Sequence, residues 1–263
     1  MTLLNHLLQS AQQMSQHRHL HLVDFTVGAL LTQVRVSDGQ HIAAGVCLTP
    51  TGEGPVNNPL RANTLEAILH AGRAYDAFAR AVAVAAMNAI AQWERAATQP
   101  PPTADAPGLR DLLVEHLLAH STPETAIVFI GHLKPVVARL REQQRQPLVF
   151  CRRHTDPAHG IYNDIFEYEA LATAERVVIT GAALIGSTLD AVLRASPQAQ
   201  ARYLIGFSAG VHPAWLHDSG ITHVASLHLA QMAQDPVMHN DLEALFKYPA
   251  YLEHVEHTEK VKR

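Results

Sequence analysis

Apolar positions at the start of the chain follow a helical spacing and then an extended one. Leucine, alanine and methionine at intervals of three and four residues predict a helix over residues 2–14. Residues 23–36 predict an extended segment, and residues 41–48 predict a strand that returns beside it. The Asp38-Gly39 pair between them favours a tight hairpin, because such a turn requires positive φ angles.

Two more helices are predicted before a proline-rich stretch. Asn63 can cap a short helix over residues 64–70, and a longer helix is predicted over residues 76–97. The alanine-rich centre of the longer helix, residues 81–91, leaves room for another backbone to approach it closely. Residues 99–108 contain three consecutive prolines, which stop a helix and stiffen a connector.

Strands and helices alternate after this connector. Strands are predicted at residues 125–130, 147–151, 176–179, around 204 and at 222–225, and helices at 109–119, 135–144, 187–195 and 214–219. Residues 152–166 are expected to be irregular, and the charged tail from residue 240 is expected to be helical and loosely packed at its end. The alternation predicts a parallel α/β sheet.

The composition change at the prolines predicts two domains. We expect an α+β domain over residues 1–98, a linker over residues 99–108, and an α/β domain over residues 109–263. Residues 50–59, rich in glycine, proline and asparagine, are expected to form a loop.

Three predicted strands end in short turns that carry polar residues. Since the carboxyl ends of parallel strands meet at one edge of a sheet, these turns are expected to lie together and to face a ligand. The first turn contains Gly131, His132 and Lys134, where His132 could act as an acid–base group or metal ligand and Lys134 could contact an anion. A surface loop with solvated side chains explains the same residues.

The other two turns combine glycines with hydroxyl groups. Thr180, Gly181, Ser187 and Thr188 precede a predicted helix, whose free N–H groups could hold a carboxylate or phosphate. Alternatively, Ser187 only caps the helix and Gly181 only turns the chain. The third turn carries candidate ligand contacts at Gly206, Ser208 and His212.

Several polar residues outside these turns are also candidates. Asn88 lies in the alanine-rich helix, where it either faces a cleft between the domains or makes a structural hydrogen bond. His17, His19 and His21 share one face if that segment is extended, and would then converge on a metal; otherwise they are solvated. Four more polar side chains, in the irregular segment and directly after it, either contribute to a metal site or are solvated: Asp156, His159, Asp164 and Glu167.

Composition excludes several classes of protein. The net charge of -4 gives no signal for nucleic-acid binding, and no run of about eighteen apolar residues exists to form a membrane span. The start of the chain lacks the features of a signal peptide, and its two cysteines are far apart, so we expect a soluble, cytoplasmic protein with reduced thiols. No nucleophile elbow, phosphate-binding loop or complete dinucleotide-binding motif is present.

The order of several short motifs resembles the DUF4213/DUF364 family, described as heavy-metal chelation proteins. The matching pieces span most of the chain and run in the same order: Val27-Gly28 to Gly45 with Thr32-x-Val34, Ala85-Ala86-Met87-Asn88-Ala89, Ile130-Gly131, Val178-Ile179-Thr180-Gly181 with Ser187-Thr188-Leu189, and Ile205-Gly206-x-Ser208. The resemblance implies an enolase-N-terminal-like α+β domain followed by a Rossmann-like domain, and it adds Thr32 to the ligand-binding candidates. The chain departs from the family pattern at Gly186-Ser187, where an asparagine and a glycine are usual, and at Phe207, where a proline is frequent.

Two functions are expected from these observations. The first is binding of a small anionic metabolite or metal complex in a cleft between the domains, with a divalent transition metal as the candidate cofactor and His132 as its candidate ligand. The second is a transferase or lyase that acts on a small anionic metabolite, for example in metallophore synthesis, with His132 as base. We also expect a homodimer, and no nucleic-acid or membrane partner.

Overall fold

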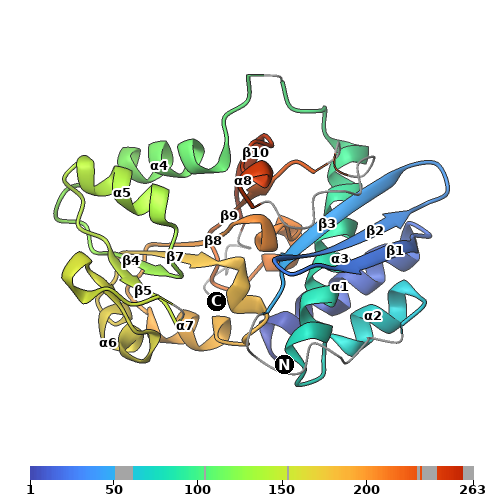
Figure 1. The fold of residues 1–263 in the computed structure, drawn as a ribbon, viewed down its shortest axis with the longest axis horizontal. Coiled ribbons are helices and arrows are strands. Elements are labelled where there is room, and N and C mark those ends of the chain that lie inside the picture. Colours follow the sequence, from blue (N-terminus) through green and yellow to red (C-terminus); the bar gives the residue numbers. More distant parts are fainter. Residues whose placement is uncertain (51–61, 104, 153, 230–231, 233–241, 257–263) are drawn as a thin grey trace, which may run out of the picture.

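The chain forms two β-sheets with helices around them. The computed structural model describes residues 1–50, 62–103, 105–152, 154–229, 232 and 242–256. Within this part of the chain, a small antiparallel sheet has the order β1-β2-β3, and a large sheet has the order β10-β9-β8-β7-β4-β5-β6. In Figure 1 the small sheet lies on the right and the large sheet extends to the left. No described helix has the length and apolar character that crossing a membrane requires.

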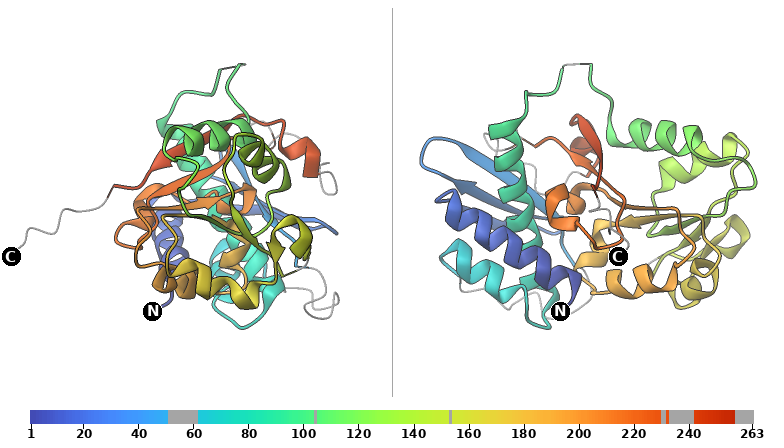
Figure 2. Two further views of the ribbon diagram at one scale, coloured as in Figure 1. Left: turned by 90° about the vertical axis from the view of Figure 1, so that its left-hand side faces the viewer. Right: turned by 180° about the vertical axis from the view of Figure 1, so that it is seen from behind.

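The small sheet and three helices form the N-terminal part. Its elements are α1 (Leu3–His17), β1 (His21–Val27), β2 (Leu31–Ser37), β3 (Ile42–Leu48), α2 (Leu65–Ala71) and α3 (Ala77–Thr98). Figure 2 shows α1 and α2 side by side when the molecule is seen from behind. Helix α3 touches the sheet at Gly45, where an added Cβ would lie 2.1 Å from the Ala89 nitrogen and 2.2 Å from the Ala85 oxygen. This confirms the close approach that the alanine-rich sequence predicted.

Two local predictions in this part were wrong. Residues 23–36 are not one extended segment, because the chain reverses after β1 and the Gly28 N–H donates to the Leu31 carbonyl at 2.8 Å. The short helix is capped by Thr64 rather than Asn63, since the Thr64 hydroxyl accepts from the Ala67 N–H at 3.1 Å. The loop predicted at residues 50–59 lies, except for Pro50, outside the described residues.

The large sheet and its helices form the C-terminal part. The strands are β4 (Ile127–Ile130), β5 (Leu148–Phe150), β6 (Ile161–Tyr162), β7 (Arg176–Thr180), β8 (Ala201–Ile205), β9 (His223–Leu227) and β10 (Ala250–His254). The α-helices are α4 (Leu109–Ala119), α5 (Lys134–Glu142), α6 (Glu167–Leu171), α7 (Leu189–Ala195) and α8 (Leu242–Leu245). All neighbouring strands are parallel except β10, which is antiparallel to β9. The mixed α/β class with a large, mostly parallel sheet is confirmed.

The details of this part differ from the sequence prediction at three places. The tail supplies an edge strand, β10, instead of only a loosely packed helix. The helix predicted from Ser187 begins at Leu189, after a 3₁₀ helix (η3, Gly181–Leu184), and the helix predicted at 214–219 is the 3₁₀ helix η5 (Pro213–Leu216). The irregular segment holds two 3₁₀ helices, η1 (Pro157–His159) and η2 (Asp164–Phe166), around the short strand β6.

The two parts are packed together through α3. The Gln92 amide donates to the Leu227 carbonyl at 2.7 Å and accepts from the Leu229 N–H at 3.2 Å, so the helix is bonded to the end of β9. One buried apolar cluster also runs from α1 and α3 to one face of the large sheet. The residues between α3 and α4 pass around the outside of the molecule in Figure 1.

Candidate functional site

A cavity of about 410 Å³ lies at the carboxyl edge of the large sheet. Its walls include the ends of β4, β5, β7 and β8, and Leu48 and Pro50 at the end of β3 add a wall from the N-terminal part. Strand β4 is the first strand of this sheet in the chain, and it lies between β5 and β7. The strand order therefore reverses at β4, and such a reversal is where open α/β sheets form their ligand crevices. We call this cavity the edge pocket.

The edge pocket has a largely apolar wall and a smaller polar one. The described apolar side chains include Leu133, Phe150, Ile185, Phe207, Leu242 and Phe246. The polar side chains are His132, Cys151, Arg152, Asp164, Glu167, Thr180, Thr188 and Ser208. A few polar groups on an apolar wall are typical of pockets that bind small organic molecules.

Two of the three predicted glycine turns already use their amides in the sheet. Gly131 and Gly206 have φ angles of 102° and 101°, which explains why glycine stands at the ends of β4 and β8. The Gly131 N–H donates to the Phe150 carbonyl at 2.8 Å, and the Gly206 N–H donates to the Ala225 carbonyl at 3.0 Å. These two amides are therefore not available to hold an anion.

The third glycine allows two turns of the chain to touch. A Cβ on Gly181 would lie 2.5 Å from the Ala209 nitrogen and 2.5 Å from the Ser208 carbonyl carbon. Both atoms belong to the 3₁₀ helix η4 (Phe207–Ala209), which follows β8. The absence of a side chain at Gly181 thus lets η3 pack against η4, and residues of both turns line the edge pocket.

His132 lines the edge pocket as a half-buried imidazole. Its ring stacks on that of His154, with centroids 5.5 Å apart and planes 4° from parallel. Burial, followed by the charges of His154 and Lys134, lowers the pKa of His132. The imidazole is therefore neutral near pH 7, which is the form that accepts a proton or binds a metal. Lys134 itself is exposed at the start of α5 and does not line the cavity.

Glu167 is the most unusual polar residue of the pocket. The residue is only 4% exposed, although it is the first residue of α6. Burial, with the nearby Asp164 carboxylate as the next cause, raises the pKa of Glu167 to about 7. Arg152 is bonded to Asp164, with 2.8 Å between its Nε and a carboxylate oxygen, and Glu167 forms no ion pair with any described residue. From the sequence, Glu167 is only one of several polar residues in or directly after the irregular segment, because nothing in the sequence shows its burial.

Some of the predicted hydroxyl-bearing residues line the edge pocket, and others make bonds outside it. Thr180 and Thr188 line the pocket, and Thr188 makes no capping bond to α7. Ser208 also lines it, but its hydroxyl accepts from the Leu48 N–H at 3.0 Å and so joins the two parts of the molecule. Ser187 does not line the pocket; its φ angle is 56° and its hydroxyl accepts from Arg80 at 2.6 Å. Ser187 therefore does not cap a helix.

Thr32 and Asn88 do not line the edge pocket. The Thr32 hydroxyl is fully buried and 3.0 Å from that of Thr49. The Asn88 amide donates to the Val46 carbonyl at 2.9 Å and to the Phe207 carbonyl at 3.4 Å. Asn88 thus makes structural bonds to both parts of the molecule. One of its partners, Phe207, lines the edge pocket.

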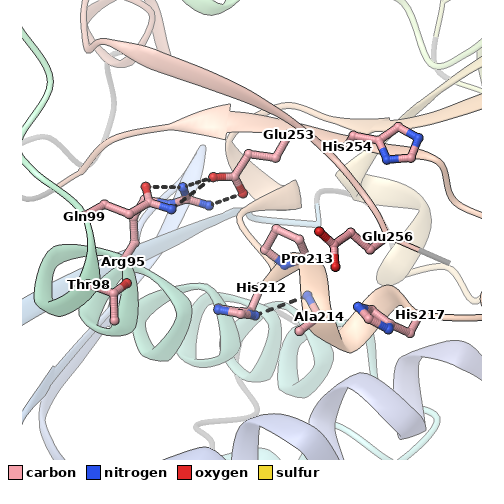
Figure 3. Close-up of a pocket in the computed structure, with 10 residues that line it drawn as sticks. All are labelled: Arg95, Thr98, Gln99, His212, Pro213, Ala214, His217, Glu253, His254 and Glu256. Carbon is pink, nitrogen blue, oxygen red and sulfur yellow. Dashed lines mark hydrogen bonds and ion pairs between the residues drawn. The ribbon is translucent and has the colours of Figure 1, made fainter. Parts of the chain in front are cut away.

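His212 belongs to a different cavity, of about 420 Å³, at the other end of the contact between the two parts. Figure 3 shows its polar groups, which come from α3, η5 and β10. Arg95 is bonded to both Glu253 and Gln99, and the His212 Nδ1 accepts from the Ala214 N–H at 3.2 Å. Arg95, Glu253, Gln99 and His212 are thus already bonded within the protein.

The described side chains do not form a site for a bare metal ion. Across the ranges described above, no three His, Cys, Asp or Glu residues are placed to hold one. His17 ends α1, His19 has a φ angle of 54° and His21 begins β1, so they do not share one strand face, and all three are exposed. His132, Cys151, Asp164 and Glu167 all line the edge pocket, but no three of these described side chains are placed to hold one ion.

Comparison with known proteins places the chain in a family. The model of DUF364, described as "Putative heavy-metal chelation", matches residues 114–237, and the model of DUF4213, with the same description, matches residues 11–91. Together they cover most of both parts of the molecule. The chain belongs to the DUF4213/DUF364 family, as its motif order indicated. The uncharacterized protein MJ0500 of Methanocaldococcus jannaschii is 28% identical over 210 residues, which are 78% of this chain and 77% of that protein.

Solved structures support the same fold. A DUF364 protein of unknown function from Pyrococcus horikoshii matches with a TM-score of 0.80 and 23% identity, over 96% of this chain and 100% of that one. A second, from Desulfitobacterium hafniense, matches with a TM-score of 0.73 and 14% identity, over 94% of this chain and 98% of that one. At these identities the likeness concerns the fold alone.

Proposed function

We propose that the edge pocket binds a small carboxylate-bearing metabolite, either free or as its metal complex. The observation that supports this most is the position of the pocket, at the strand-order reversal and against the end of β3. Arg152 is the cation among the described lining residues and is the candidate partner for a carboxylate. The family description, heavy-metal chelation, agrees with a ligand that can hold a metal.

A metal would enter this pocket as cargo rather than as a resident cofactor. A bare transition metal ion needs three or four protein donors, and the described residues do not supply such a set. A chelating metabolite brings most of the donors itself. His132, whose imidazole is neutral, would then complete the coordination of the complex.

Calorimetry with citrate as the chelator tests this function. Nickel citrate, citrate alone and nickel alone are titrated into the protein and into Leu133→Trp, which fills the pocket wall. Leu148→Trp is the matched control, because Leu148 is 41% exposed at the opposite end of β5. We expect citrate or its nickel complex to bind and Leu133→Trp to lose at least tenfold in affinity. Binding that Leu133→Trp leaves unchanged would place the ligand elsewhere.

A second candidate function is catalysis in the same pocket. A carboxyl group with a pKa of about 7 and a neutral imidazole both line it, which is how an acid and a base are prepared for work near neutral pH. His132 would accept a proton and Glu167 would donate one. The test is mass spectrometry of carboxylate metabolites incubated with the protein: a product that forms with the wild type and is lost in His132→Gln supports turnover, and unchanged metabolites contradict it.

A further inference from the structure

We infer that the ligand of the edge pocket is an aminocarboxylate whose protonated amine binds Glu167. This inference rests on the proposed binding function, and it adds the chemical class of the ligand. The evidence is the burial of one carboxyl group and the balance of charge around it.

Glu167 faces the cavity from a buried position. The residue is 4% exposed and lines the pocket, so a ligand that fills the pocket would contact it away from bulk solvent. A buried carboxyl group without a cation is costly, because it must either stay protonated or lose its hydration without compensation. Such a group at a pocket wall is satisfied most directly by a positive group of the ligand.

The neighbouring charges do not provide that positive group. After burial, Asp164 from η2 raises the pKa of Glu167, while Arg152 after β5 and a hydrogen bond with Tyr168 on α6 lower it without offsetting the rise. Arg152 is bonded to Asp164 at 2.8 Å, so its charge is shared with another carboxylate. His132 is neutral, and Lys134 lies outside the lining. The described wall thus carries two carboxyl groups for one guanidinium group.

An amine fits this wall better than a metal ion does. One ammonium group needs a single carboxylate and two further acceptors, and the hydroxyls of Thr180 and Thr188 line the same cavity. The guanidinium group of Arg152 has five N–H donors, so it can bind the carboxylate of the ligand while it stays bonded to Asp164. The apolar residues Phe207 and Phe246 are left to cover its hydrocarbon part.

Ligand-observed NMR with matched probes tests the inference. The probes are L-leucine, isopentylamine, 4-methylpentanoate and 4-methylpentanamide, which share one hydrocarbon group and differ in charge. Binding is measured at pH 6, 7 and 8 with a chelating agent present to remove metals. We expect leucine to bind best, the amine next, and affinity for both to rise about tenfold from pH 6 to pH 8, because Glu167 must be ionised.

Variants identify the group responsible. Glu167→Gln is expected to lower the affinity for leucine at least tenfold at pH 8 and to remove its pH dependence. Glu169→Gln is the matched control, since Glu169 is an exposed residue of the same helix. Circular dichroism of both variants shows whether the fold is retained, and Glu167→Asp should recover part of the affinity if only charge is required.

Other outcomes separate this inference from the proposed function. Binding of the acid or amide alone, amine binding that ignores Glu167→Gln, or affinity that rises as the pH falls would overturn the aminocarboxylate class. Binding that appears only when metal is added would overturn it too, while leaving the proposed function in place. If the probes bind Leu133→Trp as tightly as they bind the wild type, both the aminocarboxylate class and the proposed function are contradicted.

Discussion

Single residues show most clearly where sequence reasoning and structure differ. Gly181 was expected either to belong to an anion-holding turn or only to turn the chain; it lines the edge pocket, and the space for a Cβ on it is occupied by the backbone of Ser208 and Ala209. Lys134 and His212 lie in the predicted turns, yet one is exposed outside the pocket and the other lines a different cavity. The direction in which a side chain points after the end of a strand depends on packing against distant segments. A single sequence does not show that packing.

Gly181→Ala is expected to destabilise the protein by about 1–3 kcal/mol, as overpacking of a close contact does. The added Cβ would lie 2.5 Å from backbone atoms, which cannot move aside as a flexible side chain can. Gly186→Ala is the matched control, because its Cβ would meet nothing nearer than the Thr188 methyl group at 3.9 Å. Urea denaturation of the three proteins measures the difference, and equal stability of both variants would contradict the close contact.

His132 is expected to titrate below the ordinary range for histidine, because burial is the largest cause of its lowered pKa and His154 is the next. In His154→Ala the midpoint should rise only in part, since burial remains. Proton NMR of the ring resonances measures both midpoints. A midpoint at the model-peptide value of about 6.5 in the wild type would show that the ring is solvated. Any metal that His132 binds should accordingly be retained to a lower pH than an ordinary histidine permits.

At the scale of elements, local patterns were sufficient for most helices and strands but not for those that depend on distant partners. The alanine-rich helix α3 and strands β4, β7 and β8 carry their own periodic or continuous apolar signal. Strand β10 lies in a charged tail, and it becomes a strand by pairing with β9. The burial of Glu167 depends likewise on how α6 packs against other elements, so its neighbouring acidic residues suggested only a solvated segment.

Four histidine rings from α4, β9 and β10 contact one another at the edge of the large sheet opposite the edge pocket. The His116 ring is 4.3 Å from that of His120 and 5.0 Å from that of His223, and His223 is 5.1 Å from His254. Burial, and then the positive groups His116, His254, His120 and Arg176, lowers the pKa of His223 to about 4. The pKa of His116 is lowered by burial first and then by His120 and Arg176.

This cluster predicts that the protein loses stability as the pH falls from about 6.5 to about 4. Over that range the unfolded chain binds protons on His223 and His116 more readily than the folded chain does, so folding becomes less favourable. Substitution of His223 by Gln should flatten the dependence of Tm on pH, whereas His70→Gln, at an exposed residue of α2, should not. Parallel profiles for the wild type and His223→Gln would mean that the cluster does not resist protonation.

At the scale of the whole molecule, the proline-rich connector is expected to be the first site of proteolysis. Residues 99–108 run between α3 and α4 around the outside of the molecule, and proteases cut exposed connectors before packed elements. The protein is digested briefly with proteinase K, and mass spectrometry of the first fragments locates the cuts. First cuts at residues 98–108 or 52–58 support the predicted boundary, and first cuts within β4 contradict it.

The molecule is also predicted to form a homodimer, and its exposed apolar residues indicate where. Ile165 and Phe166 in η2 and Tyr168 in α6 are 71%, 53% and 45% exposed, and they are close together in the sequence. Large apolar side chains grouped on a surface are more favourable when a partner covers them. Sedimentation equilibrium should therefore give a dimer for the wild type and a monomer for the double variant Ile165→Ser, Phe166→Ser. Tyr75→Ser, which changes a fully exposed aromatic residue elsewhere, should remain dimeric. A monomeric wild type would contradict the prediction, and a dimer that persists in the double variant would place the interface on another surface.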